Sequence, residues 1–457
     1  MRKLIATVVS TKTQEQRKDL PMKTYMEQAR ELPVVADVDV LIAGGGPAGI
    51  GAAIGAAKAG AKSVLLLERS NALGGMATMG MMSHWGGYSN GQEIRKIQER
   101  AARLLDCPEG KPDRIEAIHH EALKTVLLEY LTELGVSLQF NTLIAEAITD
   151  NGHVKGVITE SKSGREAVLS KVVIDCTGDG DVAARAGAEY TLGREEDQLC
   201  QPMTLMFRIG GVDYSRAIFP HSFESLVDVP AGEIQALGRQ SLPFPAGHVL
   251  LYETPLPGEV CVNMTNAIHM DGTDVRSLTQ AEITCRRQIP AIIAFLRQYA
   301  PGYEKCYWVA SASNVGVRET RHFQTVQEMT AEDITEGKLF PDWISTGNAF
   351  NFDIHHVNGA GLDPHGAQKT FRSKGRYSIP AGCCIPKEID GLLLAGRCIG
   401  GSHKAHSNFR IMSVCFGIGQ GAGVMAAQAI QDNCEVRNVN IAAVQQKLML
   451  QDIPNHN

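Results

Sequence analysis

Among the eleven cysteines of this chain, no two are spaced C-x-x-C. That absence excludes the usual zinc-ribbon, ferredoxin and thioredoxin-like patterns, which need closely paired cysteines. Because the cysteine count is odd and the spacing is irregular, we expect most of these residues to be buried, reduced thiols that pack as small hydrophobic groups. Cys383 and Cys384 are adjacent, but a disulfide between neighbours would be strained, which favours two packed thiols.

Long apolar runs and a large net charge are also missing. No apolar run approaches the roughly 18 residues of a membrane helix. The six-residue apolar stretch near the N-terminus is shorter than the about 7–15 residues of a secretory signal. The 44 basic and 50 acidic side chains give a formal net charge of −6, which argues against electrostatic binding of nucleic acid. We therefore predict a cytoplasmic protein without a membrane span and without a nucleic-acid partner.

The composition is that of a folded protein with a sizeable core. The chain has 457 residues, of which 44% are hydrophobic and 21% charged, and disorder is excluded as its main state. The length corresponds to roughly three domains as a first expectation. Glycine is abundant, with 46 residues, and the short glycine clusters give the clearest functional signals.

The first of these clusters is GGGPAG at 44–49. It follows a short β-type run at 37–43 and precedes an Ala-rich segment at 50–59, which we predict to be a helix. A second apolar strand is predicted at 63–67, and it is followed directly by Glu68. A glycine fingerprint between strand and helix, with an acid at the end of the next strand, is typical of a dinucleotide-binding site.

Each residue of this fingerprint has a physical task. Gly44 permits a tight turn, Gly46 lets backbone amides approach a diphosphate, and Gly49 lets the helix pack closely on the strand. The helix N-terminus presents its partial positive charge to the phosphates. Glu68 accepts the hydroxyls of an adenosine ribose and would repel a 2′-phosphate.

Further elements follow from the patterning. Apolar residues at helical spacing predict a helix within 113–134, and a strand follows at 136–140. Asn151-Gly152 predicts a tight hairpin turn. A long helix is predicted near 277–299, with a capping box starting at Ser277 or Thr279.

Four further motifs carry a resemblance to a known family. They are LGG at 73–75, VIDCTGDGDVAARAGA at 173–188, GVRETR at 316–321 and the long run IPAGCC…GIGQGAG at 379–423. With these motifs the chain resembles the FAD-dependent oxidoreductases, a group related to the fumarate reductase and L-aspartate oxidase flavoproteins. The resemblance implies FAD as cofactor but implies no particular substrate.

The resemblance also implies an α/β architecture. A glutathione-reductase-like Rossmann FAD-binding domain would be discontinuous and would carry an inserted α+β substrate domain. We predict an N-terminal arm at 1–36, the two parts of the FAD-binding domain at 37–205 and 379–457, and the inserted domain at 206–378.

The FAD-binding residues are predicted from these motifs. We expect the glycine-rich segment at 417–423 to open the last helix and to point that helix's N-terminus at the flavin, with helix packing by these glycines as the alternative. The complete set of predicted FAD contacts is Gly44, Gly46, Pro47, Ala48, Gly49, Glu68, Arg69, Gly74, Gly75, Met76, Gly178, Asp179, Gly396, Arg397, Gly419, Gln420 and Gly421.

Arginines and histidines near these motifs are the catalytic candidates. If GVRETR is a strand, Arg318 and Arg321 face opposite sides. One would bind a substrate carboxylate and the other would pair with Glu319 or another acid, while an ion-pair ladder at the surface is the alternative. His403, His406 and Arg410 lie between two flavin motifs, where the fumarate reductase relatives place a histidine and an arginine that bind substrate carboxylate or donate a proton. Structural or flavin-contacting roles are the alternative for each.

Metal binding and covalent flavin attachment are two other roles considered for histidines. His403 and His406 have no third ligand evident in the sequence, so no metal is predicted. His84 follows the Gly74-Gly75 turn and could hold flavin covalently, although its surroundings do not match such sites. His355 and Trp343 are candidates for lining a pocket.

The sequence therefore predicts an FAD-dependent oxidoreductase that transfers a hydride between a small organic substrate, such as a carboxylate, and flavin N5. The alternative is a flavin-bearing electron-transfer subunit without substrate chemistry of its own. A second nucleotide fingerprint is absent, so no NAD(P)H domain is expected. The electron partner would be the substrate itself, oxygen, a quinone or another protein.

Overall fold

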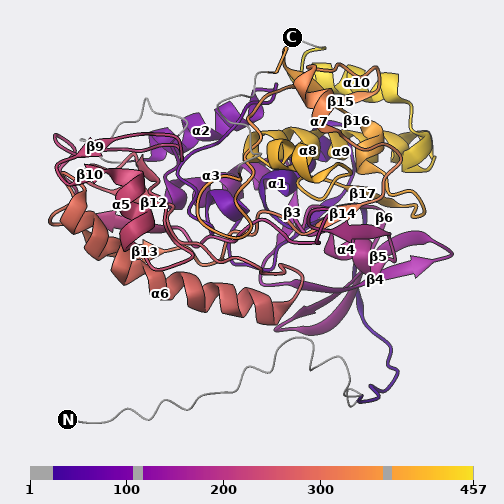
Figure 1. Cartoon of the computed structure of the whole chain (residues 1–457). Helices are drawn as coiled ribbons and strands as arrows, with labels where there is room; N and C mark the ends of the chain where they lie inside the picture. The colour runs from indigo at the N-terminus through magenta and orange to yellow at the C-terminus, as the bar shows by residue number, and fades with distance from the viewer. Residues whose placement is uncertain (1–23, 106–116, 364–372, 456–457) are drawn as a thin grey trace.

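The computed structural model describes residues 24–105, 117–363 and 373–455. Its central element is a seven-stranded mixed sheet (Figure 1). Five of the strands are parallel and follow the order β3 (Ser137–Gln139), β2 (Val64–Leu67), β1 (Val34–Ala43), β6 (Gly164–Asp175) and β17 (Leu392–Leu394). The strand β17, late in the chain, thus returns to the sheet begun by β1, as a discontinuous nucleotide-binding fold requires.

The fingerprint segment folds as predicted from its sequence. β1 leads into the glycine turn, and α1 (Pro47–Lys58) begins directly after Gly46, with proline in its first turn. β2 ends immediately before Glu68 and pairs with β1 through Ala43 and Leu67. β1 begins three residues earlier than predicted, at Val34, while most of the predicted N-terminal arm lies outside the described residues.

An antiparallel extension completes the sheet. β4 (Leu143–Asp150) and β5 (His153–Ser161) form a hairpin, and β5 pairs with the first part of β6. The predicted tight turn lies between β4 and β5, where Asn151 at φ 49° and Gly152 at φ 79° adopt the left-handed conformation. The hairpin projects from the sheet on the right of Figure 1.

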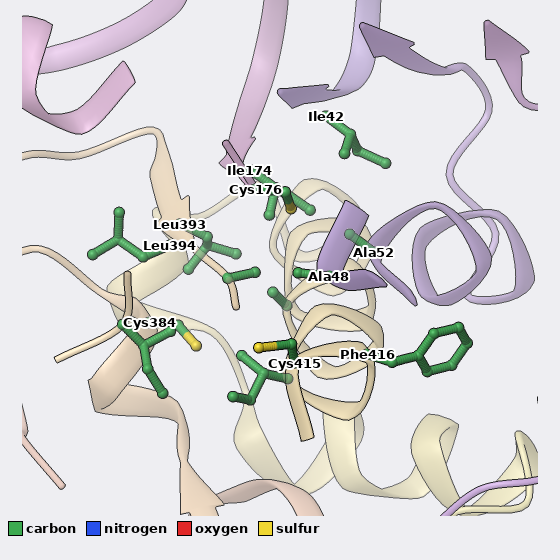
Figure 2. Packing of buried hydrophobic residues seen from close by; sticks show 14 of the residues in the cluster. Ile42, Ala48, Ala52, Ile174, Cys176, Cys384, Leu393, Leu394, Cys415 and Phe416 are labelled. Carbon is green, nitrogen blue, oxygen red and sulfur yellow. The ribbon is translucent and has the colours of Figure 1, made fainter. Parts of the chain in front are cut away.

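Helix α9 (Met412–Asp432) lies against α1 and is the central helix of the core. Figure 2 shows Ala48 and Ala52 of α1 beside the turns of α9 that carry Cys415 and Phe416. By length and composition α9 could span a membrane, contrary to the sequence-based expectation, but 94% of its apolar window is buried inside the protein. It is therefore the core helix of this fold.

A second apolar core lies beside the first. It is built around a four-stranded antiparallel sheet and the long helix α6 (Val275–Tyr299), on the left of Figure 1. The N-cap of α6 is Asp274, whose carboxylate accepts the Arg276 N–H, so the predicted capping boxes are wrong. The second core uses residues between 203 and 312, whereas buried side chains between 323 and 379 join the first core. The domain bounds remain a prediction.

The remaining elements surround these two cores. The other helices are α2 (Glu93–Leu104), α3 (His120–Glu133), α4 (Asp181–Arg185), α5 (Ile234–Ser241), α7 (Ala331–Thr335), α8 (His403–Phe409) and α10 (Ile441–Leu450). The other strands are β7 (Tyr190–Leu192), β8 (Phe207–Gly210), β9 (Asp228–Val229), β10 (Gly232–Glu233), β11 (Leu251–Glu253), β12 (Val260–Val262), β13 (Tyr307–Ser311), β14 (Arg321–Phe323), β15 (Trp343–Asn348) and β16 (Tyr377–Pro380). The beginning of the helix predicted at 113–134 falls partly on residues outside the described part.

Candidate active site

A long open cavity runs along the carboxyl ends of the parallel strands. It contains about 1230 Å³ of empty space, including the part open to solvent. It brings together the glycine fingerprint, the loop after β6 and the segment after β17, which are far apart in the sequence. Of the predicted FAD contacts, the cavity is lined by Gly44, Gly46, Pro47, Ala48, Glu68, Arg69, Gly75, Met76, Gly178, Asp179, Gly396 and Arg397.

Gly46 forms the part of the cavity wall where α1 begins. Its φ of −73° and ψ of −175° are an extended conformation that any residue can adopt. A Cβ at Gly46 would meet no heavy atom within 4 Å among the described residues, so a side chain there would extend into the cavity. The first turn of α1 leaves its amides without acceptors inside the helix. This cradle fits an anionic diphosphate.

Gly44 and Gly49 allow neighbouring backbone segments to pack closely. At Gly44, φ is +100°, and a Cβ would lie 2.7 Å from the Cys176 carbonyl oxygen. At Gly49, a Cβ would lie 1.9 Å from the Gly44 carbonyl oxygen. Both positions therefore need glycine for the close approach of strand, turn and helix.

Glu68 lies at the other side of the turn with its carboxylate held in place. Its Oε2 accepts the Gly45 N–H at 2.6 Å, and its Oε1 accepts the Ser70 N–H at 2.7 Å and the Ser70 hydroxyl at 2.8 Å. Oε2 accepts only one hydrogen bond among the described residues and keeps a free acceptor site, and Glu68 lines the cavity. The carboxylate is thus positioned to accept ribose hydroxyls.

Three distant motifs meet at Asp179. The Asp179 Oδ1 accepts the Thr320 hydroxyl at 2.6 Å and an Arg397 N–H at 2.7 Å. The Asp179 carbonyl accepts an Arg321 N–H at 2.9 Å. The TGDG loop, the GVRETR segment and the AGR segment therefore form one hydrogen-bonded wall of the cavity, with Gly178 at φ +86° packed under Arg397.

The prediction that Gly419, Gln420 and Gly421 open the last helix is wrong. Helix α9 begins at Met412, so these residues lie in its middle, and they do not line the cavity. A Cβ at Gly419 would lie 1.9 Å from the Ala48 carbonyl oxygen, which shows that this glycine allows α9 to approach α1. Met412, in the first turn, lines the cavity instead.

This correction can be tested by Gly419→Ala. Helix propensity alone would stabilise the folded protein by up to about 1 kcal/mol, whereas overpacking against α1 should destabilise it by about 1–3 kcal/mol or more. We expect a lower free energy of unfolding in urea. Gly375→Ala is the control, because a Cβ there meets no described atom within 4 Å. A Gly419→Ala protein at least as stable as wild type would contradict the packing.

Arg410 is a charged residue of the cavity lining. It follows α8 directly, lines the cavity and is held by Asp353, whose carbonyl oxygen and Oδ2 each accept an Nη2–H at 2.9 Å. The Arg410 Nε is buried and has no hydrogen-bond partner in the part of the chain that the structure describes. One edge of the guanidinium is thus fixed, and one buried donor remains for a ligand.

Arg318 and two histidines surround this pair. Burial, and then the positive charge of Arg410, lower the pKa of Arg318 to about 10. Burial is the main cause that lowers the pKa of His355 to about 4, and the positive charge of Arg318 is the next. The His355 Nε2 lies 3.3 Å from Asp353 Oδ2. Burial, and then His355, lower the pKa of His248 to about 3. Burial raises the pKa of Asp353, but His355 and the arginines outweigh burial and leave the pKa below its ordinary value.

The other catalytic candidates occupy different surroundings. Arg321 pairs with Asp181 at 3.0 Å, and only the end of GVRETR is a strand, because β14 begins at Arg321. His403 Nδ1 lies 2.5 Å from Glu319 Oε1, and His406 is 1% exposed. Of these candidates only Arg410 lines the cavity. Arg318 lies near Arg410, and the two histidines lie beside Glu319.

Several residues of the site were not predicted. Asp353 and His248 had no motif to mark them, and only His355 was noted as a candidate for lining a pocket. His84 contacts the ring of Tyr252 at 5.2 Å and does not line the cavity. Cys383 and Cys384 are buried free thiols, and in Figure 2 the sulfur of Cys384 points toward that of Cys415.

Fold and cavity together define a dinucleotide-binding protein of the α/β class with a parallel sheet. Residues 39–448 match the family described as FAD dependent oxidoreductase, and the chain belongs to that family. It is an FAD-dependent oxidoreductase. Its likeness to the fumarate reductase flavoproteins remains a prediction.

Solved structures of flavin-dependent enzymes show a distant likeness. A geranylgeranyl bacteriochlorophyll reductase-like protein from Thermoplasma acidophilum is 14% identical, with 91% of this chain and 83% of that chain covered and a TM-score of 0.44. The flavin-dependent brominase Bmp2 is 13% identical, with 91% of this chain and 84% of that chain covered and a TM-score of 0.46. The p-nitrophenol 4-monooxygenase PnpA from Pseudomonas putida DLL-E4 is 14% identical, with 92% of this chain and 84% of that chain covered and a TM-score of 0.42. No curated protein matches the chain.

Proposed function

We propose that this enzyme transfers a hydride between a small organic carboxylate and N5 of FAD. The observation that supports this proposal is an excess of positive charge among Arg410, which lines the cavity, and the buried groups around it. Arg318 and Arg410 contribute two positive charges, and Asp353 contributes one negative charge. His248 and His355 are neutral near pH 7, because their pKa values are about 3 and about 4.

An uncompensated buried charge is costly. A substrate carboxylate would remove the imbalance, and an arginine fork is suited to bind it with two parallel hydrogen bonds. Asp353 fixes the orientation of Arg410 through the two hydrogen bonds to its Nη2, which reduces the entropy lost when a ligand binds. The charge balance therefore favours a monoanionic substrate over an amine or an uncharged alcohol.

The proton that accompanies the hydride needs a separate acceptor. His355 Nε2 lies 3.3 Å from Asp353 Oδ2, so a tautomer protonated at Nε2 would leave Nδ1 free to accept a proton. FAD, when bound along the cavity, would supply the redox chemistry by taking up or releasing the hydride. In this arrangement Arg410 orients the substrate, Arg318 adds positive charge beside it, and His355 is a neutral base that takes up the proton only transiently.

An anaerobic reduction screen tests this function. The holoenzyme is mixed with a panel of small 2-hydroxy, 2-amino and saturated carboxylates, each paired with its primary amide, and the oxidised flavin absorption is followed. We expect at least one carboxylate to reduce the flavin much faster than its amide. If only amines or alcohols reduce it, the carboxylate assignment is wrong. If no small molecule reduces it but a protein or quinone donor does, the electron-transfer alternative holds.

A further inference from the structure

We propose that Glu319, His322 and His406 bind one divalent first-row transition-metal ion, such as Zn²⁺. One potential ligand atom from each of the three side chains lies within 4.8 Å of those from the other two, and all three residues are buried. None of them lines the FAD cavity, so the proposed function does not use them.

The three residues come from two short motifs that the fold brings together. Glu319-x-x-His322 leads into β14, and His403-x-x-His406 lies on α8, where residues three apart share a helix face. The rings of His322 and His406 are in contact, with centroids 4.9 Å apart and planes at 75°. No third ligand for His403 and His406 was evident from the sequence; folding supplies a carboxylate and another imidazole next to His406.

The donor set is chemically appropriate. Two imidazole nitrogens and one carboxylate oxygen form a common site for Zn²⁺ and Fe²⁺, with remaining coordination positions for water or another ligand. The ligand atoms need only small shifts to bind one ion, because His322 Nε2 is already 2.8 Å from Glu319 Oε1. Metal–ligand bonds of about 2.0–2.2 Å place neighbouring ligand atoms at a similar or slightly greater separation.

The hydrogen bonds around His322 also favour a metal site. Its Nδ1 lies 3.2 Å from the Gly401 carbonyl oxygen, and a carbonyl can only accept, so Nδ1 carries the proton. Nε2 is then the ring nitrogen that faces the carboxylate oxygen of Glu319. Histidine ligands of metals characteristically donate their other N–H to a carbonyl or carboxylate.

The surrounding contacts support the same three ligands. His406 is 1% exposed, and its Nδ1 has no hydrogen-bond partner among the residues that the structure describes. The Glu319 Oε2 accepts the Gln201 N–H at 2.9 Å, which fixes the carboxylate. His403, whose side chain is 19% exposed, contacts Glu319 Oε1 through Nδ1, so it orients the carboxylate and marks the side from which an ion can enter.

The competing interpretation is a metal-free contact in which His322 and Glu319 hydrogen-bond directly to each other. The two interpretations differ in metal affinity. The full-length holoenzyme is treated with a chelator, dialysed and titrated with Zn²⁺ by calorimetry, and bound zinc is counted by mass spectrometry. We expect one Zn²⁺ per chain and an upward shift of the melting temperature on adding Zn²⁺.

Variants make this assignment specific. Glu319→Gln keeps the shape of the side chain, and His406→Asn keeps a polar group; we expect each to weaken Zn²⁺ binding at least about 100-fold and to abolish the melting shift while retaining FAD. His269→Ala, an exposed histidine elsewhere, is the control for adventitious binding and should bind zinc as wild type does. The proposal is overturned if wild type binds no zinc, or if its affinity is the same in Glu319→Gln. Should His406→Asn fail to fold, Glu319→Gln alone decides.

Discussion

Replacing Gly46 with valine should abolish FAD binding while leaving the fold intact. The backbone at Gly46 is extended and suits a β-branched residue, and a Cβ there meets no described atom within 4 Å. The valine side chain would therefore occupy the cradle at the start of α1 that the diphosphate must approach. We expect the purified variant to be colourless and the flavin released on denaturation to fall to background.

The stability comparison needs a matched reference. Bound FAD stabilises the wild-type protein by mass action, so Gly46→Val is compared with deflavinated wild type, and we expect free energies of unfolding within about 0.5 kcal/mol of each other. Gly375→Val places the same side chain in open space outside the cavity and should retain FAD. Wild-type flavin occupancy in Gly46→Val would show that the cradle is misassigned.

Replacing Arg410 with lysine should slow substrate-linked flavin reduction by about 10²-fold, which corresponds to about 3 kcal/mol in the transition state. Lysine keeps the positive charge but lacks the planar guanidinium, which can form two parallel hydrogen bonds to a carboxylate. FAD should remain bound, because the variant leaves Gly46 and Glu68, the predicted diphosphate and ribose contacts, unchanged. The measurement is stopped-flow reduction of the bound flavin by the best carboxylate of the screen.

A second arginine controls for a general effect of this substitution. Arg297 on α6 donates to the Cys306 carbonyl at 2.8 Å and does not line the cavity. We expect Arg297→Lys to reduce its flavin at the wild-type rate. If Arg410→Lys also reduces flavin at the wild-type rate, Arg410 is structural and the substrate binds elsewhere.

The fingerprint region was predictable because its physical requirements are local. A strand, a glycine turn, a helix and an acid at the next strand end can be inferred from about 30 consecutive residues. The Asn151-Gly152 turn was predictable for the same reason, since its backbone conformation depends on the two residues themselves. Asp179 was marked by its motif, although the sequence did not reveal that it hydrogen-bonds Thr320 and Arg397.

The errors arose where a residue's role depends on a distant segment. Gly419 looks like part of a turn when only its neighbours are considered, and only the nearby α1 carbonyl explains why glycine is needed in mid-helix. Asp353 lies in a segment without helical or strand periodicity, so its pairing with Arg410 had no sequence signal. Glu319 was considered a partner for arginine, whereas folding surrounds it with imidazoles.

The central claim is that the Arg410 side chain binds the carboxylate of the substrate beside FAD. A thermodynamic cycle tests it most directly: the rates of flavin reduction by a carboxylate and by its primary amide are measured in wild type and in Arg410→Lys. If the two groups interact, their effects are not additive. We predict that the carboxylate-to-amide rate ratio, large in wild type, falls strongly in Arg410→Lys. An equal ratio in both proteins would contradict the claim.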